Sequence, residues 1–225
     1  MLVLALDTST SAVTAGLLRL PAADSPEVLA ARVTVNARAH GELLMPSVCE
    51  VLATAGARMR DLDAVVCGAG PGPFTGLRVG MVTAAALGDA LGIPVYPAGS
   101  LDAIAYRAGA GSPLLVVADA RRREVYWARY DSAGTRVEGP HVSRPGDVPL
   151  EGVSRVAGAS DLLAEVLDDV LDIHVDPPRH PDPAALVAVV AAAVRSQAPP
   201  GPLTPLYLRR PDAAEPGPRK RVSPV

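Results

Sequence analysis

The stretch that most limits the possible folds is Gly68-Ala69-Gly70-Pro71-Gly72-Pro73-Phe74-Thr75-Gly76-Leu77-Arg78-Val79-Gly80. An apolar run over residues 64–67 precedes it and is typical of a buried strand, and a helix is expected to follow over 75–91. A strand, a glycine-rich turn and a helix bring backbone N–H groups up to an anion or to another segment of backbone. The P-loop motif needs a lysine after its last glycine, and Lys220 is the only lysine in the chain. The dinucleotide-binding pattern is also excluded, because its third glycine comes one residue late, at Gly76.

The length and composition are those of a folded protein with one domain or two small ones. The chain has 225 residues, of which 49% are hydrophobic and 20% charged, and this balance does not suit a disordered protein. Its longest apolar run, over 186–194, is about half of what a membrane span requires. The apolar start meets Asp7 without a basic leader, so it predicts a strand rather than a signal peptide. We therefore expect a cytoplasmic protein in which Cys49 and Cys67 are free and mostly buried thiols.

The formal net charge of −3 argues against a dedicated nucleic-acid-binding protein. Basic residues nevertheless gather at the end of the chain, where residues 209–225 hold five of them and only two acidic ones. A basic, proline-rich tail can contact a phosphate backbone, but most such tails are solvated and disordered. Both interpretations of the tail stay open at this point.

Hydrophobic runs and turn residues predict one order of elements, βββαβα, twice along the chain. In the first half we expect strands over 2–6, 13–20 and 28–35, a helix over 41–54, the strand 64–67, the helix 75–91, the strand 93–96 and a helix that begins at Ser100. Pro46 is expected either to kink the helix over 41–54 or to delay its start. In the second half we expect strands over 114–118, 124–130, 135–142 and 155–159, a helix over 161–170, and a last helix over 184–195 with Asp182 as its N-cap.

This duplicated order predicts an α/β protein of two lobes, the second of them reduced. We place the first lobe at residues 1–105, with the surface that contacts a partner, and the second at 106–202. A C-terminal segment, 203–225, ends in the basic tail. Both lobes begin with a strand that ends in an aspartate, Asp7 and Asp119.

The order of elements resembles the actin, sugar-kinase and Hsp70 superfamily (the ASKHA fold), whose first hairpin carries an aspartate that anchors nucleotide phosphates. Within it the chain resembles the bacterial TsaB (YeaZ) family. The matching stretches are Leu4–Thr10, His40–Pro46, Gly70–Gly80, Asp119–Tyr126 and Pro205–Arg209. They span nearly the whole chain. One departure is Pro73, where the family usually has serine.

The resemblance implies a subunit of the complex that makes tRNA threonylcarbamoyladenosine. In that family the subunit pairs with TsaD, which transfers the threonylcarbamoyl group to the adenosine beside the anticodon, and the pair works with the ATPase TsaE. The role implied here is a non-catalytic scaffold that reaches tRNA only through the complex and forms a homodimer when alone. No cofactor is expected to bind tightly, and ATP or ADP is expected at most at the interface of the complex.

The residues themselves argue against independent catalysis. The residues at the position of the first phosphate loop, which we call the vestigial loop, are Asp7, Thr8, Ser9 and Thr10. Ser9 stands where the superfamily has a glycine, and that glycine lets the backbone approach the phosphate closely. At the second loop, Ala120 and Arg121 carry Cβ atoms where an open turn is needed. Asp7 is expected either to hold a metal–phosphate or to bond the next turn. No two histidines have the spacing of a helical metal pair, so no metal site is predicted.

Two helices of the first half are expected to form the partner surface. Their apolar and small residues form stripes that suit close helix packing, and the expected contact residues are Leu44, Val48, Val51, Phe74, Leu77, Gly80, Ala84 and Gly88. Packing within one chain also explains such stripes. Phe74 can equally anchor an interface or pack its ring into the core beneath its own loop. The rival function, from a different class, is an ATP-dependent small-molecule kinase of the same fold. A glycopeptidase-like protein is a further alternative, for which the chain offers no nucleophile and base.

Overall fold

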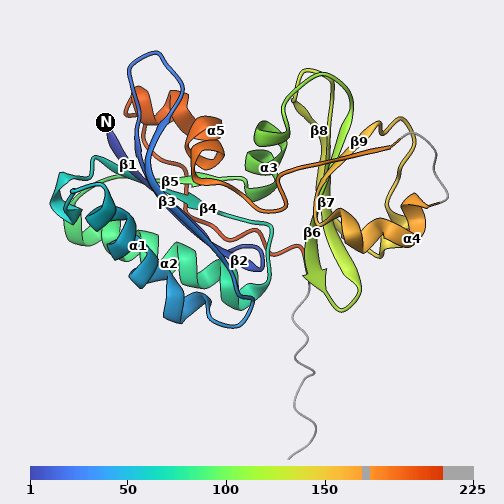
Figure 1. Ribbon diagram of the computed structural model, residues 1–225, viewed down its shortest axis with the longest axis horizontal. Coiled ribbons are helices and arrows are strands. Elements are labelled where there is room, and N and C mark those ends of the chain that lie inside the picture. The colour runs from blue at the N-terminus through green and yellow to red at the C-terminus, as the bar shows by residue number, and fades with distance from the viewer. Residues whose placement is uncertain (169–172, 210–225) are drawn as a thin grey trace, which may run out of the picture.

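The computed structural model describes residues 1–168 and 173–209 and consists of two lobes side by side (Figure 1). The first lobe holds a five-stranded mixed sheet in the order β3-β2-β1-β4-β5. Its strands are β1 (Leu2–Asp7), β2 (Ala12–Arg19), β3 (Glu27–Val35), β4 (Ala64–Gly68) and β5 (Val95–Ala98). β2 pairs antiparallel with β1 and β3, whereas β4 lies parallel to β1 and β5.

The second lobe repeats this topology. Its sheet has the order β10-β9-β6-β7-β8, which is the order of the first sheet when it is read from the other end. Its strands are β6 (Leu114–Arg121), β7 (Glu124–Tyr130), β8 (Arg136–Ser143), β9 (Arg155–Gly158) and β10 (His174–Asp176). The predicted duplicated α/β fold is therefore confirmed.

The second lobe is reduced, as expected, because a single 3-10 turn over Pro145–Asp147 stands where the first lobe has a long helix. The helix expected over 161–170 is shorter in the structure. A 3-10 turn over Ser160–Leu163 leads into α4 (Ala164–Leu167), and residues 169–172 lie outside the described part of the chain. Sequence patterns did not predict the short strand β10.

Two long helices, α1 (His40–Thr54) and α2 (Phe74–Leu91), cover one face of the first sheet. Their inner side chains form a core with alternate residues of β1, β2 and β4, such as Leu4, Leu17 and Val65. Pro46 lies inside α1, and the helix continues through it.

The other face of the first sheet is covered from the far end of the sequence. α5 (Pro183–Arg195) packs there, with Leu186, Val187 and Val194 against Val3 and Val66. Asp182 caps it, as predicted, by accepting a 2.8 Å hydrogen bond from the N–H of Ala185. The helix α3 (Ser100–Ala108), by contrast, packs Leu101 and Ile104 on the second sheet. The two lobes thus exchange their third helices, and the lobe boundaries placed at 105 and 202 stay a prediction.

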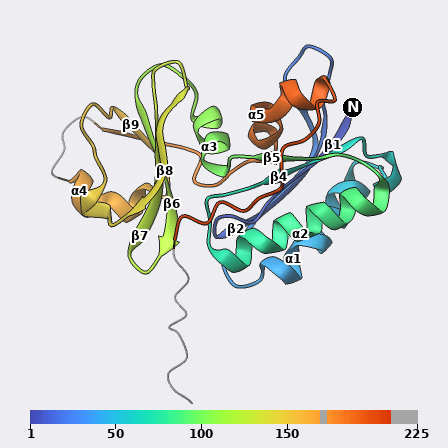
Figure 2. The same ribbon diagram turned by 180° about the vertical axis from the view of Figure 1, so that it is seen from behind.

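The segment after α5 returns across both lobes (Figure 2). The N–H of Leu206 donates to the carbonyl of Ala69 in the first lobe at 3.2 Å. Three residues later, Arg209 donates to the carbonyl of Ala120 in the second lobe and forms an ion pair with Glu124. Most of the predicted basic tail, residues 210–225, lies outside the described residues.

Candidate functional site

Asp7, which is expected either to hold a metal–phosphate or to bond the next turn, is completely buried at the end of β1. Its Oδ1 accepts hydrogen bonds from the N–H and the hydroxyl of Ser9, at 2.8 and 2.7 Å, and its Oδ2 accepts one from the hydroxyl of Ser100 at 2.6 Å. Burial raises the pKa of Asp7 above its ordinary value, and the hydrogen bonds from Ser100 and Ser9 oppose that shift. Three hydrogen-bond donors of the protein thus bind this carboxylate. Of the two roles left open for Asp7, the structure shows the hydrogen bond to the next turn.

Thr8 fastens the first hairpin to α2. Its hydroxyl donates to the carbonyl of Gly76 at 2.7 Å and accepts from the N–H of Gly80 at 2.9 Å. A Cβ on Gly76 would lie 2.6 Å from the Thr8 carbonyl oxygen, and one on Gly80 would lie 2.5 Å from the Thr8 hydroxyl oxygen. Both glycines are therefore required by packing inside the chain.

The glycine-rich turn is packed in the same way. A Cβ on Gly72 would lie 2.4 Å from the carbonyl oxygen of Ser9. The carbonyl of Gly72 also accepts a 3.3 Å hydrogen bond from the hydroxyl of Tyr126, which comes from the second lobe. Thr10 completes the vestigial loop, and its carbonyl accepts a 2.8 Å hydrogen bond from His40 Nε2. All four residues of the vestigial loop are buried, with exposed fractions of 8% or less.

The expected contact residues on α1 and α2 face the core. Seven of the eight are buried in the single chain, namely Leu44, Val48, Val51, Leu77, Gly80, Ala84 and Gly88. The Cβ that Gly88 lacks would lie 2.4 Å from Val95 Cγ2, so this position also packs against its own sheet. This corrects the choice of face: the stripes complete the first-lobe core, and a partner can reach only the opposite faces of the two helices.

Phe74, the eighth residue, is 54% exposed and so does not plug its loop into the core. Its ring stacks on Tyr207 with centroids 5.1 Å apart, and the guanidinium of Arg78 lies 3.9 Å above it. Arg78 Nε also donates to the Tyr207 hydroxyl at 2.8 Å. Phe74 thus holds the C-terminal segment, a role that the quoted stretch Pro205–Arg209 did not reveal.

The second hairpin has no open phosphate loop. Asp119 accepts a 2.7 Å hydrogen bond from the N–H of Arg121 and pairs with its guanidinium at 3.1 Å. Arg121, Arg122 and Arg123 all have left-handed backbone, with φ of 65°, 54° and 62°. They form the tip of the turn between β6 and β7.

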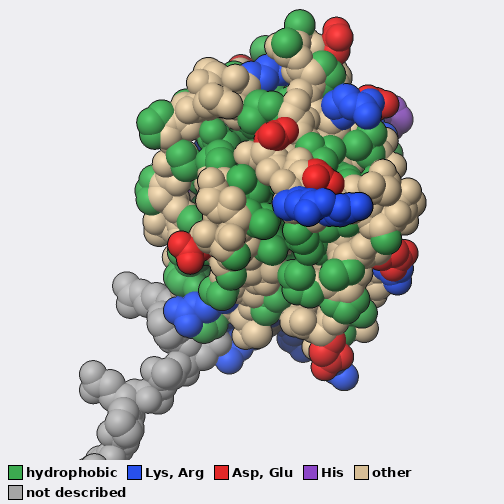
Figure 3. Space-filling model, turned by 90° about the vertical axis from the view of Figure 1, so that its left-hand side faces the viewer, with side chains coloured by type: hydrophobic (Ala, Val, Ile, Leu, Met, Phe, Trp, Pro, Cys, Tyr) green, Lys and Arg blue, Asp and Glu red, His purple; other side chains and the backbone are tan. Residues whose placement is uncertain are grey.

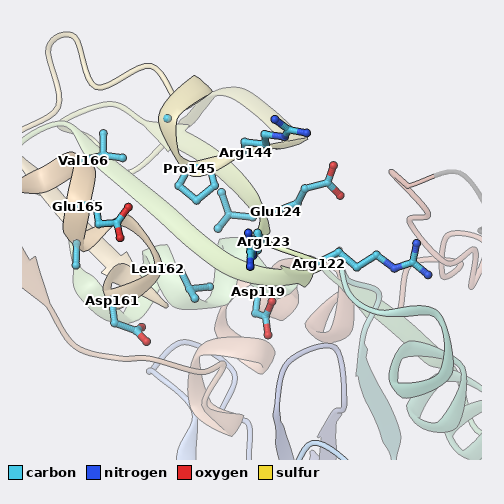
Figure 4. A pocket seen from close by; sticks show the side chains of 13 residues that line it. Asp119, Arg122, Arg123, Glu124, Arg144, Pro145, Asp161, Leu162, Glu165 and Val166 are labelled. Atoms are coloured by element: carbon cyan, nitrogen blue, oxygen red, sulfur yellow. The ribbon is translucent and has the colours of Figure 1, made fainter.

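A hollow of about 860 Å³ lies beside this turn, and sequence reasoning missed it. Figure 4 shows Asp161 and Glu165 on one of its walls and Arg122 extending away from them. Asp161 is already paired with Arg179, whose hydrogen bonds hold the pKa of Asp161 below its ordinary value. Because both acidic and basic side chains line the hollow, its charge does not indicate which class of ligand it would bind.

Residues 1–168 and 173–209 contain no group of three His, Cys, Asp or Glu side chains placed to hold a metal ion. None of the helices described is long and apolar enough to span a membrane. Both cysteines are free, as expected, but the expected burial is found only for Cys67, where it raises the pKa of the thiol, and is wrong for Cys49, which is exposed.

The two-lobed fold with a repeated sheet topology defines a duplicated α/β protein. A family model described as "TsaD: tRNA N6-adenosine threonylcarbamoyltransferase" matches residues 28–154. YeaZ from Pseudomonas aeruginosa superposes with a TM-score of 0.75 at 27% identity, over 92% of this chain and 99% of that one.

Two relatives show how far the likeness extends in sequence. An uncharacterized protein of Mycobacterium tuberculosis is 53% identical over 94% of this chain and 93% of its own length. The tRNA threonylcarbamoyladenosine biosynthesis protein TsaB of Escherichia coli is 32% identical over 58% of this chain and 55% of its own length. The chain belongs to the family of the matching model and, within it, to the TsaB (YeaZ) family.

Proposed function

We propose that this protein takes part in the synthesis of tRNA threonylcarbamoyladenosine as a non-catalytic scaffold. It binds a TsaD-type sister subunit and supports that subunit in transferring the threonylcarbamoyl group to the anticodon-adjacent adenosine. The names of the TsaB relatives and the TsaD-type family model support this proposal.

The observation that carries the proposal is the outward face of α1 and α2. Val82 is 65% exposed and Met45 is 36% exposed, and the neighbouring outward positions include Cys49, Ala85 and Ala86. Figure 3 views the first lobe from its outer end and shows hydrophobic side chains interspersed with polar atoms and several charged side chains. Exposed hydrophobic side chains that gather on one helix face can mark a protein interface.

The non-catalytic part of the proposal rests on the two phosphate loops. The carboxylate of Asp7 is occupied by protein donors, and Ala120 and Arg121 stand where the second loop would need an open turn. We infer that the chain holds no cofactor tightly by itself and that ATP or ADP, where it binds, lies at the interface of the complex. The remaining partners in the proposal are a TsaE-type ATPase and, through the complex, tRNA, in the cytoplasm.

Substitution of Val82 tests the interface, with Val35 as a matched control. Val35 lies on β3 and is 64% exposed, so both valines have the same side chain and the same exposure. Val82→Arg should weaken both the homodimer and the complex with the TsaD-type subunit about 100-fold or more, because it places an unpaired charge in an apolar contact. Val35→Arg should leave both unchanged.

Light scattering measures the two assemblies, and thermal unfolding confirms that each variant is folded. Gly80 and Ala84 do not serve this test, because both are buried and a large side chain there disrupts the fold itself. Association that survives Val82→Arg would rule out this surface. Steady ATP hydrolysis by the pure chain, abolished by Asp7→Asn, would instead support the rival kinase function.

A further inference from the structure

The turn between β6 and β7 combines an unfavourable backbone with a run of three arginines, residues 121–123, which we call the arginine turn. Arg122 and Arg123 form its two-residue loop, and both have positive φ, as in the type I′ turns of hairpins. Such turns favour asparagine and glycine, because a Cβ strains left-handed backbone. Among the other described residues, Gln197 is the one non-glycine residue with positive φ. Strained positions that retain unfavourable residues are typical of functional sites.

The charge around the arginine turn is positive, although the whole chain is acidic. Four carboxylates line the hollow beside the turn. Three of them form ion pairs with arginines outside that lining, namely Asp119 with Arg121, Asp161 with Arg179 and Glu124 with Arg209. The lining that is left holds three arginines, Arg122, Arg123 and Arg144, against Glu165. The excess of positive charge therefore belongs to the turn and to Arg144.

These arginines are also accessible. Arg123 and Arg144 are exposed, and neither forms an ion pair within residues 1–168 and 173–209. Figure 4 shows Arg122 and Arg144 extending away from the wall that carries Asp161. Their guanidinium groups are therefore available to a partner in solution.

The C-terminal segment brings further basic sequence to the same place. Arg209 donates to the carbonyl of Ala120 at 3.2 Å and pairs with Glu124 at 3.3 Å, so it bonds the strands on both sides of the turn. The sequence that follows it, residues 210–225, contains four basic and two acidic residues. The basic end of the chain thus begins at the arginine turn.

We propose that the arginine turn and Arg144 bind the phosphate backbone of tRNA when the protein is part of its complex. Guanidinium groups form bidentate, charge-assisted hydrogen bonds with phosphate. Contacts to phosphate supply affinity and position a nucleic acid without reading its sequence. An acidic protein surface is the other partner that such arginines fit, and tRNA is favoured because it is the substrate in the proposed function, on which this inference rests.

The position of the turn is compatible with the proposed partner surface. That surface lies on α1 and α2 of the first lobe, whereas the turn joins two strands of the second lobe. One molecule can therefore bind a sister subunit and tRNA at the same time, and substitutions in the turn should leave the association of the subunits unchanged.

Fluorescence anisotropy of a labelled, unmodified tRNA transcript, titrated with the complex of this chain and its TsaD-type subunit, tests the contact. Arg123→Gly and Arg144→Gln should each weaken binding roughly threefold to tenfold. Each should also lower the slope of log affinity against log salt concentration by about 1, because one phosphate contact is lost. Arg60→Gln, at an exposed arginine of the first lobe, is the control and should change neither value.

Thermal unfolding separates a lost contact from a damaged fold. Arg123→Gly should raise the Tm by about 2–4 °C, because glycine adopts positive φ without strain. Gln197→Gly, at the other left-handed position, should raise the Tm as well but leave the affinity for tRNA unchanged. Weaker binding by a more stable protein cannot come from partial unfolding.

Light scattering of the same variants with the TsaD-type subunit distinguishes the possible failures. If the complex forms and the two arginine variants keep the affinity and the salt slope of the wild type, the tRNA contact is overturned and the proposed function stands. If Arg123→Gly and Arg144→Gln lose the TsaD-type subunit instead, the turn contacts a protein and the tRNA contact is overturned. If the wild-type chain forms no complex, both the proposed function and this inference are overturned.

Discussion

Asp7 Oδ2 accepts a 2.6 Å hydrogen bond from the hydroxyl of Ser100, the first residue of α3. This bond joins the first strand of one sheet to the helix that packs on the other sheet. Asp7 therefore links the two lobes.

Asp7→Asn should change how stability depends on pH. Burial raises the pKa of Asp7 above its ordinary value of 3.8, so the folded protein retains this proton at a higher pH than the unfolded chain. The stability that the group contributes is complete below pH 3.8 and is lost as pH rises through the raised pKa. The free energy of unfolding of Asp7→Asn, relative to wild type, should therefore increase with pH over that window.

Urea denaturation at a series of pH values measures this difference. Asp161→Asn is a control of opposite sign, because the hydrogen bond from Arg179 lowers the pKa of Asp161. Its contribution is present above pH 3.8 and is lost as pH falls through the lowered pKa, and it is small because the pair is exposed. A difference between Asp7→Asn and wild type that stays constant with pH would contradict the prediction.

Gly80→Ala should destabilise the protein by roughly 1–3 kcal/mol, because the new methyl group would overlap the hydroxyl of Thr8. Gly41→Ala provides the contrast. No atom lies within 4 Å of its Cβ position, so alanine there should stabilise α1 by up to about 1 kcal/mol. Thermal or urea unfolding of the two variants measures both values, and equal effects at the two positions would refute the packing argument.

A fragment of residues 1–105 should not fold by itself. α5, which covers one face of the first sheet, lies outside that fragment, and its loss exposes Val3, Val66 and Leu18. The same fragment with residues 178–198 joined through a flexible linker should recover cooperative unfolding, as followed by circular dichroism. A cooperatively folded fragment 1–105 would mean that α5 is dispensable to the first lobe.

Tyr207→Ala should lower the free energy of unfolding by about 1 kcal/mol, because its ring stacks on Phe74 and contacts Arg78. A double-mutant cycle with Phe74→Ala should give a coupling of about 0.5–1.5 kcal/mol. Tyr106→Ala, at a tyrosine that is 53% exposed on α3, serves as the control and should show no coupling to Phe74. Zero coupling between Phe74 and Tyr207 would show that the C-terminal segment is not held there.

Much of the fold could be predicted from hydrophobic periodicity and turn residues. β7 was predicted with its observed bounds, and Asp182 was recognised as the cap of α5, because both signals are local. β10 was missed because three residues, two of them exposed, give no periodic pattern. The position of α5 on the first sheet was beyond prediction, since periodicity shows that one side of a helix is apolar and not which sheet covers it.

The same limit explains the candidate site. Val48 and Ala84 mark the apolar stripes of their helices correctly, but those stripes face the sheet and leave Val82 outside. The glycines of the turn were recognised as sites of close approach, and the structure shows that Thr8 and Ser9 are the groups that approach.

The exchange of α3 and α5 constrains how such a chain can arise by gene duplication. A half-length ancestor with one sheet would have had no neighbouring lobe from which to receive its third helix. It would have covered that sheet either with its own helix or with the helix of a second, identical molecule, as domain-swapped dimers do. Fusion of two such copies would convert the exchange between molecules into the exchange now seen within one chain, and each half would then depend on the other.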